Sequence, residues 1–290
     1  MSLLKRFQKA RRKCAATLLT LSTSSYLTFG QVVLFENEQD EGQAAYKIET
    51  PTATYYFQTE AGAFSSILDK DGNDWVSFNR NAGPWGMYRG LPNLVHPENY
   101  FHPGYKNCQS EVVHNSRRRV TIASASLNGK WKCTWDIYPT HATLTVTQTD
   151  RRPYWLLYEG TPGGTFSESD DYYFLADGSK HPCSEPMEQR ALSSPEWVCF
   201  GDKSFNRVFY IAHHEADDAP DQYYPMNGMT VWGFGRNYRC CEKFMVKTPN
   251  VFSVGFIENT DAAVVRKKLR KEFYKSGGGK SKVVQLSENH

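Results

Sequence analysis

The stretch VTIASASLNGKWKCTWDIYPTHATLTVTQT, residues 120–149, decides the fold class. It contains three runs, residues 120–127, 130–137 and 142–149, in which apolar side chains alternate with hydroxyl or other polar ones. Such alternation is typical of a strand with one buried face. Asn128-Gly129 between the first two runs predicts a hairpin with a type I′ turn, because this turn needs positive φ at both central residues.

Similar short runs, rich in Val, Ile, Thr and aromatic residues, recur along the chain. They lie at 46–48, 52–58, 64–68, 75–78, 154–159, 197–200, 207–213, 229–234 and 251–257, with turn signals such as Asp71-Gly72-Asn73 and Asn227-Gly228 between them. Short strands with Gly- and Pro-rich loops predict a sandwich or a barrel, and we expect an all-β antiparallel sandwich. One C-terminal helix is expected at Thr260–Phe273, capped by Thr260 or Asp261, with Val264, Val265, Leu269 and Phe273 on one stripe.

Residues 52–78, TATYYFQTEAGAFSSILDKDGNDWVSF, add a more specific pattern. A predicted strand crosses a glycine, a second runs into the Asp-x-Asp-Gly turn at 69–72, and a third returns. This order resembles the opening of galactose-mutarotase-like β-supersandwich proteins, and the resemblance implies an architecture common in carbohydrate-active enzymes. The catalytic His and Glu motifs of that family have no match in this sequence, so none is carried over.

The net charge of +3 is an average over unlike parts. Residues 1–30 hold six basic residues and no acidic one, and residues 266–282 hold eight basic residues and one acidic one. Residues 31–265 therefore carry 20 basic and 29 acidic side chains. Because phosphate binding needs a positive face, we expect no nucleic-acid partner.

The N-terminus has the order of a secretory signal peptide. A basic segment, residues 1–13, precedes the mildly apolar run CAATLLTLSTSSYLTF at 14–29, which is too short and too rich in Ser and Thr for a membrane span. We therefore expect a signal peptide at 1–30, a linker at 31–43, one β-sandwich domain at 44–275 and a flexible tail at 276–290. The protein is then secreted or periplasmic, and an irregular cytosolic extension is the alternative interpretation.

Cysteine usage fits export. Without Cys14, six cysteines remain, namely Cys108, Cys133, Cys183, Cys199, Cys240 and Cys241. Six permit three disulfides, with reduced buried thiols as the alternative. The sequence contains no Cys-x-x-Cys pair, so its cysteines do not indicate a zinc site.

Residues 83–105, GPWGMYRGLPNLVHPENYFHPGY, form the segment densest in candidate functional side chains. Scaffolds place binding residues on non-periodic loops of this kind, although a purely structural loop remains the alternative. The candidates are Arg89, Asn93, His96, Glu98, Tyr100, His102 and Tyr105.

A second segment, residues 211–224 (IAHHEADDAPDQYY), follows a predicted strand. Its carboxylates at Asp217, Asp218 and Asp221 could hold a calcium ion, and His213 with a remote histidine could hold a transition metal. The spacing matches neither an EF-hand nor His-Glu-x-x-His, so no metal motif is assigned and a solvated acidic loop is the alternative.

Two shorter elements complete the candidate site. Glu159 lies where a predicted strand meets a Gly-x-Pro-Gly turn, a suitable place for an acid, a base or a substrate contact. In the sequence Trp232-Gly233-Phe234-Gly235-Arg236, Trp232 and Arg236 are candidate substrate-binding residues, because small residues let a ligand approach and a tryptophan stacks on sugar rings. The alternative interpretation of these aromatic residues is core packing.

These features favour a secreted carbohydrate-active enzyme whose partner is a polysaccharide or oligosaccharide, above all a lyase that cleaves a uronate-containing glycan by β-elimination. Such a lyase must neutralise the uronate carboxylate and take the C5 proton. Arg89, Asn93 and His102 are the candidates for the first task, and Tyr105, His213 and Tyr224 for base or acid.

Three alternatives stay open. A glycoside hydrolase would draw its two carboxylates from Glu98, Glu159 and Glu215. A non-catalytic carbohydrate-binding module would use Trp85 and Trp232 as a stacking platform. A mutarotase or epimerase acting on small sugars is the function to which the family resemblance points.

Overall fold

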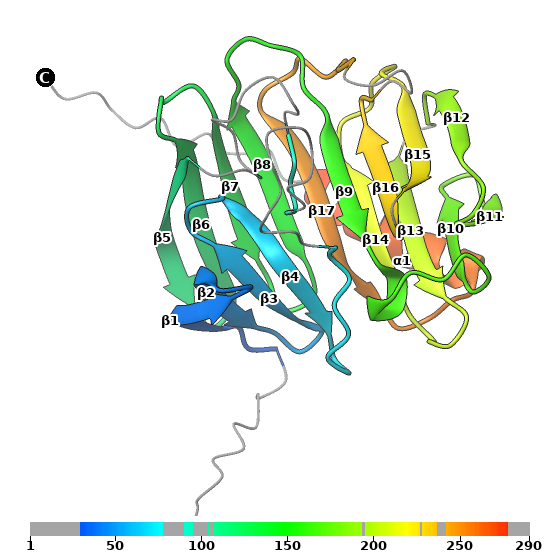
Figure 1. The fold of residues 1–290 in the computed structure, drawn as a ribbon, viewed down its shortest axis with the longest axis horizontal. Coiled ribbons are helices and arrows are strands. Elements are labelled where there is room, and N and C mark those ends of the chain that lie inside the picture. The colour runs from blue at the N-terminus through cyan, green and yellow to red at the C-terminus, as the bar shows by residue number, and fades with distance from the viewer. Residues whose placement is uncertain are drawn as a thin grey trace, which may run out of the picture.

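Two layers of antiparallel β-sheet form the molecule (Figure 1). The computed structural model describes residues 30–77, 90–94, 104, 107–192, 195–226, 228–236 and 242–277. The back layer is one nine-stranded sheet. In spatial order it contains β11 (Lys180–Pro182), β10 (Asp171–Leu175), β13 (Glu196–Asp202), β14 (Val208–His213), β17 (Asn250–Ile257), β8 (Ala142–Gln148), β7 (Lys132–Ile137), β6 (Arg119–Ser126) and β5 (Cys108–Ser116).

The front layer consists of two four-stranded sheets that lie side by side (Figure 1). The first contains β1 (Val33–Asp40), β2 (Gln43–Glu49), β3 (Ala53–Gln58) and β4 (Ala63–Asp69) in that order. The second contains β12 (Met187–Arg190), β15 (Asp221–Met226), β16 (Met229–Phe234) and β9 (Leu156–Gly160), and the short 3₁₀ helix η1 (Pro162–Gly164) follows β9. The predicted all-β sandwich with one C-terminal helix is confirmed.

A short segment, residues 90–94, joins the two front sheets. Leu91 pairs with Phe64 of β4, and Asn93 pairs with Leu157 of β9. The amide of Leu157 donates to the Asn93 carbonyl at 2.9 Å, and the amide of Phe64 donates to the Leu91 carbonyl at 2.9 Å. Gly104 packs against this segment so closely that a Cβ there would lie 1.8 Å from the Pro92 oxygen. The front layer is therefore continuous from β1 to β12.

Aromatic side chains fill the space between the layers. The rings of Phe64 on β4 and Trp135 on β7 lie 4.5 Å apart, and Tyr158 on β9 lies 5.2 Å from Phe209 on β14. Each such ring stabilises the fold by about 2–3 kcal/mol through burial. Much of the 14 % aromatic content is thus core, as the alternative interpretation of the sequence held.

The helix α1 (Ala262–Gly277) lies behind the back sheet (Figure 1). Asp261 caps it, because its Oδ1 accepts from the amides of Ala263 and Val264, each at 2.9 Å. Val265 and Leu269 are buried in a second apolar cluster against the outer side of β10, β13 and β14. Val264, expected on the same stripe, is 38 % exposed.

The hairpin predicted at Asn128-Gly129 connects β6 and β7, but its turn is not type I′. Gly129 has φ of 71°, whereas Asn128 does not have positive φ. Asn128 instead accepts hydrogen bonds from Ser126 Oγ at 2.7 Å and from the Lys130 amide at 3.1 Å. These side-chain bonds stabilise a longer loop, so one positive φ is enough.

The strands that the sequence did not predict are mostly edge strands or short ones. β1 falls within residues 31–43, predicted as a linker, and β5 closes the other layer; both are largely exposed along their length. Edge strands need no continuous apolar face, so they give little alternation. β10, β11, β12 and β15 were also not expected, and β15 contains Pro225, which is normally a sign against a strand. Residues 75–77, the described part of the strand predicted at 75–78, form no strand, and the isolated bridge nearby lies just before them, between Asp74 and Leu68.

The cysteines of the described residues are not paired. Cys108, Cys133, Cys183 and Cys199 are buried free thiols, and Cys240 and Cys241 lie outside the described residues. Burial raises the pKa of the Cys108 thiol to about 12. The prediction of three disulfides is therefore wrong, and the alternative of buried reduced thiols holds for these four.

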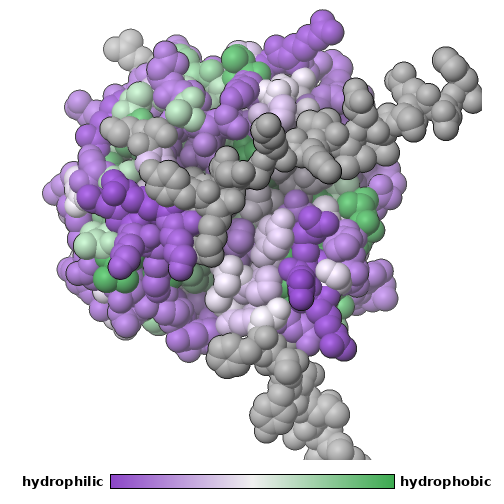
Figure 2. Space-filling model, turned by 180° about the vertical axis from the view of Figure 1, so that it is seen from behind, coloured by the Kyte–Doolittle hydropathy of each residue, from purple (hydrophilic) through white to green (hydrophobic). Residues whose placement is uncertain are grey.

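The side of the molecule opposite to that in Figure 1 is mainly hydrophilic, with a paler band down its middle (Figure 2). Alternation explains the polarity: Thr143 and Thr145 of β8 point away from a core that contains Leu144 and Val146. Among the described residues, no helix has both the length and the apolar character needed to cross a bilayer.

Candidate functional site

The candidate site lies on the outward side of β9 and β16, which are neighbours in the front layer (Figure 1). Alternation along β9 turns Leu156 and Tyr158 into the core, so Leu157 and Glu159 point outward. We call this set of residues the front-face cluster. It consists of Asn93, Trp155, Glu159, Arg236 and Lys243.

Arg236 lies across β16. A Cβ on Gly233 would meet the Arg236 Cβ and Cδ at 2.7 Å and Leu157 Cδ2 at 2.9 Å. The absent side chain of Gly233 therefore gives room to the arginine rather than to a ligand, which differs from the expected reason for this glycine. Arg236 Nε and Nη1 are shielded from solvent and have no hydrogen-bond partner among the described residues. Burial lowers the pKa of Arg236, and the Glu159 carboxylate opposes this shift.

Trp155 and Lys243 complete the cationic side of the cluster. Lys243 pairs with Arg236 through an isolated β-bridge, and both cations approach the Trp155 ring. The Lys243 Nζ lies 5.4 Å and the Arg236 Cζ 5.8 Å from the ring centroid. Cation–π attraction of this kind stabilises two like charges side by side. Neither Trp155 nor Lys243 was predicted; the alternation Trp155-x-Leu157-x-Glu159 was a usable signal for the first, and nothing marked the second.

Glu159 and Asn93 supply the polar side. Glu159 is 4 % exposed and Asn93 is 2 % exposed. Asn93 pairs with Leu157, which precedes Glu159 by two residues on β9. Across the sheet, Val231 of β16 pairs with Glu159 and also with Tyr224 of β15. Tyr224 is 37 % exposed, and it lies two strands from Glu159, about 10 Å between backbones. Three residues predicted for the site, Asn93, Glu159 and Arg236, thus belong to the front-face cluster, and a fourth, Tyr224, lies two strands from Glu159.

His213 lies elsewhere, in the interior at the end of β14. Its Nδ1 is 2.6 Å from Glu196 Oε2, its Nε2 is 2.7 Å from Asn250 Oδ1, and its ring stacks on Phe252 with 4.7 Å between centroids. The residue is 1 % exposed. A histidine held on both nitrogens inside the core is not open to a polysaccharide, so this placement does not support the predicted role of His213 as a base or an acid.

The acidic residues near His213 divide into two environments. Asp221 is 1 % exposed, whereas Asp217 and Asp218 are exposed on the loop after β14. The amide of Gly235 donates to Asp221 Oδ1 at 3.1 Å, and the amide of Asp217 donates to Glu196 Oε1 at 3.2 Å. Burial raises the pKa of Asp221 well above its usual value, and the Glu196 charge adds to this effect. The three aspartates therefore do not form one shared site.

Trp232 does not offer a stacking surface. It is fully buried, and its ring meets Phe234 edge-on with 5.5 Å between centroids. Its predicted role in substrate binding is wrong, because β16 turns it toward the core. The remaining predicted site residues lie outside the described residues, and so does Trp85. These site residues are Arg89, His96, Glu98, Tyr100, His102 and Tyr105.

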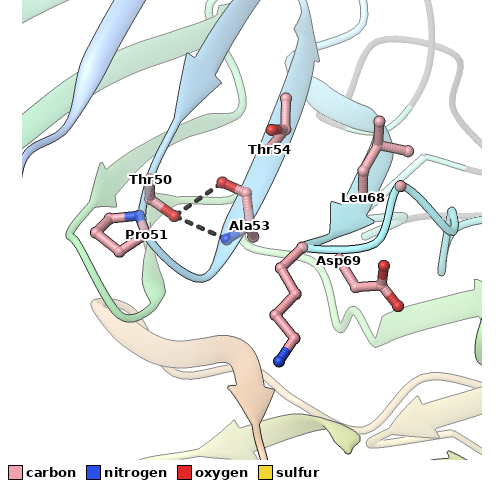
Figure 3. Close-up of a pocket in the computed structure, with 8 residues that line it drawn as sticks. Thr50, Pro51, Ala53, Thr54, Leu68 and Asp69 are labelled. Carbon is pink, nitrogen blue, oxygen red and sulfur yellow. Dashed lines mark hydrogen bonds between the residues drawn. The ribbon is translucent and has the colours of Figure 1, made fainter. Parts of the chain in front are cut away.

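A surface hollow lies where β3 begins and β4 ends, and Figure 3 shows the residues that line it. Its volume is about 520 Å³, and Thr50, Thr54 and Asp69 are among the residues that line it. Its polar groups are already engaged, since Thr50 Oγ1 bonds the Ala53 backbone and Asp69 bonds Arg207 and the Trp75 indole. This hollow therefore reflects turn geometry rather than a binding site.

Comparison with known proteins places the fold and not the function. Neither protein-family models nor curated protein sequences gave a match. The crystal structure of HI1317 is similar to this chain with a TM-score of 0.52 at 12 % sequence identity, covering 78 % of this chain and all of HI1317. At this identity the likeness shows a shared fold alone.

Two further solved structures are weaker matches. A galactose mutarotase related enzyme from Lactobacillus acidophilus has a TM-score of 0.43 at 11 % identity, over 75 % of this chain and 98 % of its own. A galactose mutarotase-like protein from Lactobacillus casei has a TM-score of 0.43 at 10 % identity, over 74 % of this chain and all of its own. The resemblance to galactose-mutarotase-like proteins is thus present and weak.

Proposed function

We propose that the front-face cluster binds an anionic saccharide and that the protein cleaves a uronate-containing glycan by β-elimination. The observation that carries the proposal is Arg236, whose Nε and Nη1 are shielded from water and lack a partner among the described residues. A buried guanidinium with unpaired N–H groups is costly unless a ligand completes its hydrogen bonds. A carboxylate matches the guanidinium geometry with two parallel hydrogen bonds.

The charges around Arg236 select the ligand further. Lys243 adds a second positive charge over the same Trp155 ring, so the site attracts an anion. Glu159 sets a limit on how close a second negative group can come, because it is buried beside Arg236. A sugar with one carboxylate on an otherwise hydroxylated ring satisfies both conditions, since its hydroxyl groups can donate to Glu159.

Elimination requires a base and an acid at two positions on the sugar. In our proposal, Glu159 takes the C5 proton while Arg236 and Lys243 neutralise the uronate carboxylate. The electron pair of the C5–H bond forms the C4–C5 double bond, and the C4–O bond breaks. Tyr224 gives its proton to the departing oxygen. Its place two strands from Glu159 leaves room for one sugar ring between the two side chains.

The proposal extends to where the protein works. Anionic polysaccharides are extracellular polymers, and the expected signal peptide at residues 1–30 would deliver the protein to them. Sequencing the N-terminus of the protein recovered from culture medium or periplasm tests this part. A mature chain that starts near Gln31 agrees with it, and intact Met1 in the cytosol contradicts it.

The activity itself is tested by incubating the protein with a panel of uronate polymers. Formation of the C4–C5 double bond raises the ultraviolet absorbance of the product. We expect Arg236→Gln to lower kcat/KM by about 10- to 100-fold, because a charge-assisted hydrogen bond to the substrate is lost. Glu159→Gln and Tyr224→Phe should lower kcat more than they raise KM.

Matched controls come from exposed residues of the same types. Arg118→Gln in the turn between β5 and β6 and Glu188→Gln on β12 should leave turnover unchanged. No absorbance change with any polymer, in a protein whose circular dichroism shows intact sheet, would contradict the lyase. Binding of a uronate oligomer without turnover would favour a carbohydrate-binding module, and anomerisation of free monosaccharides would favour a mutarotase.

A further inference from the structure

A second charged surface, separate from the front-face cluster, lies on the helix α1 behind the back sheet (Figure 1), on the hydrophilic side of the molecule that Figure 2 shows. Val265 and Leu269 face the sheet. With 3.6 residues per turn, the side chains between and just after them therefore point sideways or outward. These are five cations in six positions, and we call them the basic helix face: Arg266, Lys267, Lys268, Arg270 and Lys271.

The charges of the basic helix face are not neutralised by the protein. Four of the five side chains are exposed and Arg266 is half-buried. None of them forms an ion pair with a residue that the structure describes. Acidic residues nearby are engaged elsewhere: Glu258, before the helix, pairs with Arg207 at 3.1 Å, and Asp177, in the turn between β10 and β11, pairs with Arg190 at 3.5 Å.

These unpaired cations also repel one another. Arg266 and Arg270 are four residues apart, as are Lys267 and Lys271. Like charges at this spacing are neighbours on a helix surface and destabilise it. An anion that lies across the basic helix face would remove this repulsion.

Lys180 extends the positive surface from the helix to the edge of the back sheet. It pairs with Phe174 of β10, whose side chain belongs to the apolar cluster under α1, so Lys180 lies on the same face of the sheet as the helix. Its Nζ lies 3.5 Å from the centroid of the Tyr172 ring. Arg266 reaches the same hairpin, because a Cβ on Gly178 would lie 2.2 Å from Arg266 Nη2.

The surroundings of the basic helix face distinguish between classes of anion. A helix that lies on a membrane turns an apolar side toward the lipid. In α1 this side is buried against the sheet, and Val264 is the exposed large apolar residue among its described side chains. Duplex nucleic acid carries one charge per about 1.7 Å, and the acidic residues 31–265 repel such a polymer more strongly than one with a single carboxylate per sugar.

We propose that the basic helix face and Lys180 form a second binding surface for an anionic polysaccharide, which holds the polymer without cleaving it. This inference rests on the proposed function, since it takes the substrate of the front-face cluster as its ligand. A helix rises about 1.5 Å per residue, so cations four residues apart stand about 6 Å apart along its axis. This spacing is close to the length of one sugar ring, so successive carboxylates of a polyuronate meet successive cations.

The two surfaces lie on opposite sides of the molecule, which determines the ligands that use both. The two β-layers pack about 10 Å apart and the helix adds about 10 Å more. A polymer must therefore pass round the edge of the sandwich to contact both surfaces, and a tetrasaccharide is too short to do so. A long polymer held at the helix raises the local concentration of sugar units at the front-face cluster.

The test compares two triple variants of the full chain, each of which removes three positive charges. The helix variant carries Lys267→Gln, Arg270→Gln and Lys271→Gln, and the control carries Arg117→Gln, Arg118→Gln and Lys132→Gln at exposed positions near the other end of the back sheet. Titration calorimetry with a polyuronate at low salt measures binding without turnover. We expect the helix variant to bind the polymer about tenfold more weakly and the control to stay within about twofold of the wild type.

Kinetics separates this inference from the proposed function. The helix variant should raise KM for the long polymer several-fold and leave kcat unchanged, and it should leave KM for the tetrasaccharide unchanged. Polymer binding that depends on the helix, in a protein without turnover, would contradict the lyase and support the second surface.

Three outcomes overturn the inference. Unchanged polymer affinity in the helix variant shows that the helix does not hold the polymer, whether or not the protein is a lyase. Equal weakening in both triple variants shows an effect of net charge alone. Tighter binding of duplex DNA or of phosphatidylserine vesicles than of the polyuronate assigns the basic helix face to another class of partner.

Discussion

The front-face cluster and the inner polar residues around His213 contain similar side chains, but the two regions differ in how completely these side chains are hydrogen-bonded. Around His213, both ring nitrogens are bonded and a phenylalanine covers the ring face. Around Arg236, two N–H groups have no partner among the described residues although the side chain is largely shielded. A polar group whose partners are internal serves the stability of the fold, whereas one that is incompletely paired is available to a ligand. Pairing, rather than residue type or burial, separates the two regions.

The largest effect expected from this comparison is on stability at His213. His213→Ala removes two hydrogen bonds and leaves Glu196 Oε2 without its partner in the core, so we expect a loss of about 3–4 kcal/mol in the free energy of unfolding. Urea denaturation measures it. His114→Ala on the exposed strand β5 is the control and should change stability by less than about 0.5 kcal/mol. A loss below about 1 kcal/mol at His213 would show that its bonds are not structural.

The contrast between the regions was only partly visible in the sequence. Alternation in residues 120–149 predicted β6, β7 and β8 well, because each of these central strands has one face against the core. His213 was expected in the right strand, but no sequence pattern indicates that Glu196 and Asn250 occupy both of its nitrogens. These partners are 17 and 37 residues away, and only the order of β13, β14 and β17 in the sheet brings them together.

The same limit applies to the front-face cluster. Glu159 and Arg236 were predicted one by one, from a turn and from a glycine-rich run. Their association depends on the pairing of Val231 with Glu159 and Gly233 with Leu157, which is a long-range register. Trp232 was misassigned because a single tryptophan on a strand carries no sign of the face to which it points until the register is known.

A second, smaller effect is expected at Gly233. Gly233→Ala would place a Cβ 2.7 Å from two carbons of Arg236, so the arginine must move off β16. We expect a loss of about 2 kcal/mol in stability, as for other overpacked sites, and weaker binding of a uronate oligomer although residue 233 need not touch it. Denaturation and titration calorimetry measure the two effects.

A double-mutant cycle isolates the cause. In an Arg236→Gly background, which removes both the Cβ and the Cδ of residue 236, Gly233→Ala should cost clearly less, because of these three contacts only the one with Leu157 Cδ2 at 2.9 Å remains. An equal loss of stability in both backgrounds would mean that Gly233 does not position Arg236. The need for a glycine at residue 233 would then not come from the arginine.

The smallest effect concerns the other end of β13, where a carboxylate pair has no histidine. Asp171 on β10 pairs in register with Asp202 on β13, and burial together with Asp202 raises the pKa of Asp171 to about 7. Since the folded-state pKa lies above the unfolded value, the fold binds an extra proton and loses stability as the pH rises from about 4 to 7.

Asp171→Asn keeps a hydrogen-bond donor toward Asp202 without the charge, so it should stabilise the protein by about 1 kcal/mol at pH 8 and leave its stability unchanged near pH 4. Urea denaturation at both pH values measures the difference, and a variant that is less stable at pH 8 would show that the Asp171 carboxylate is ionised and paired.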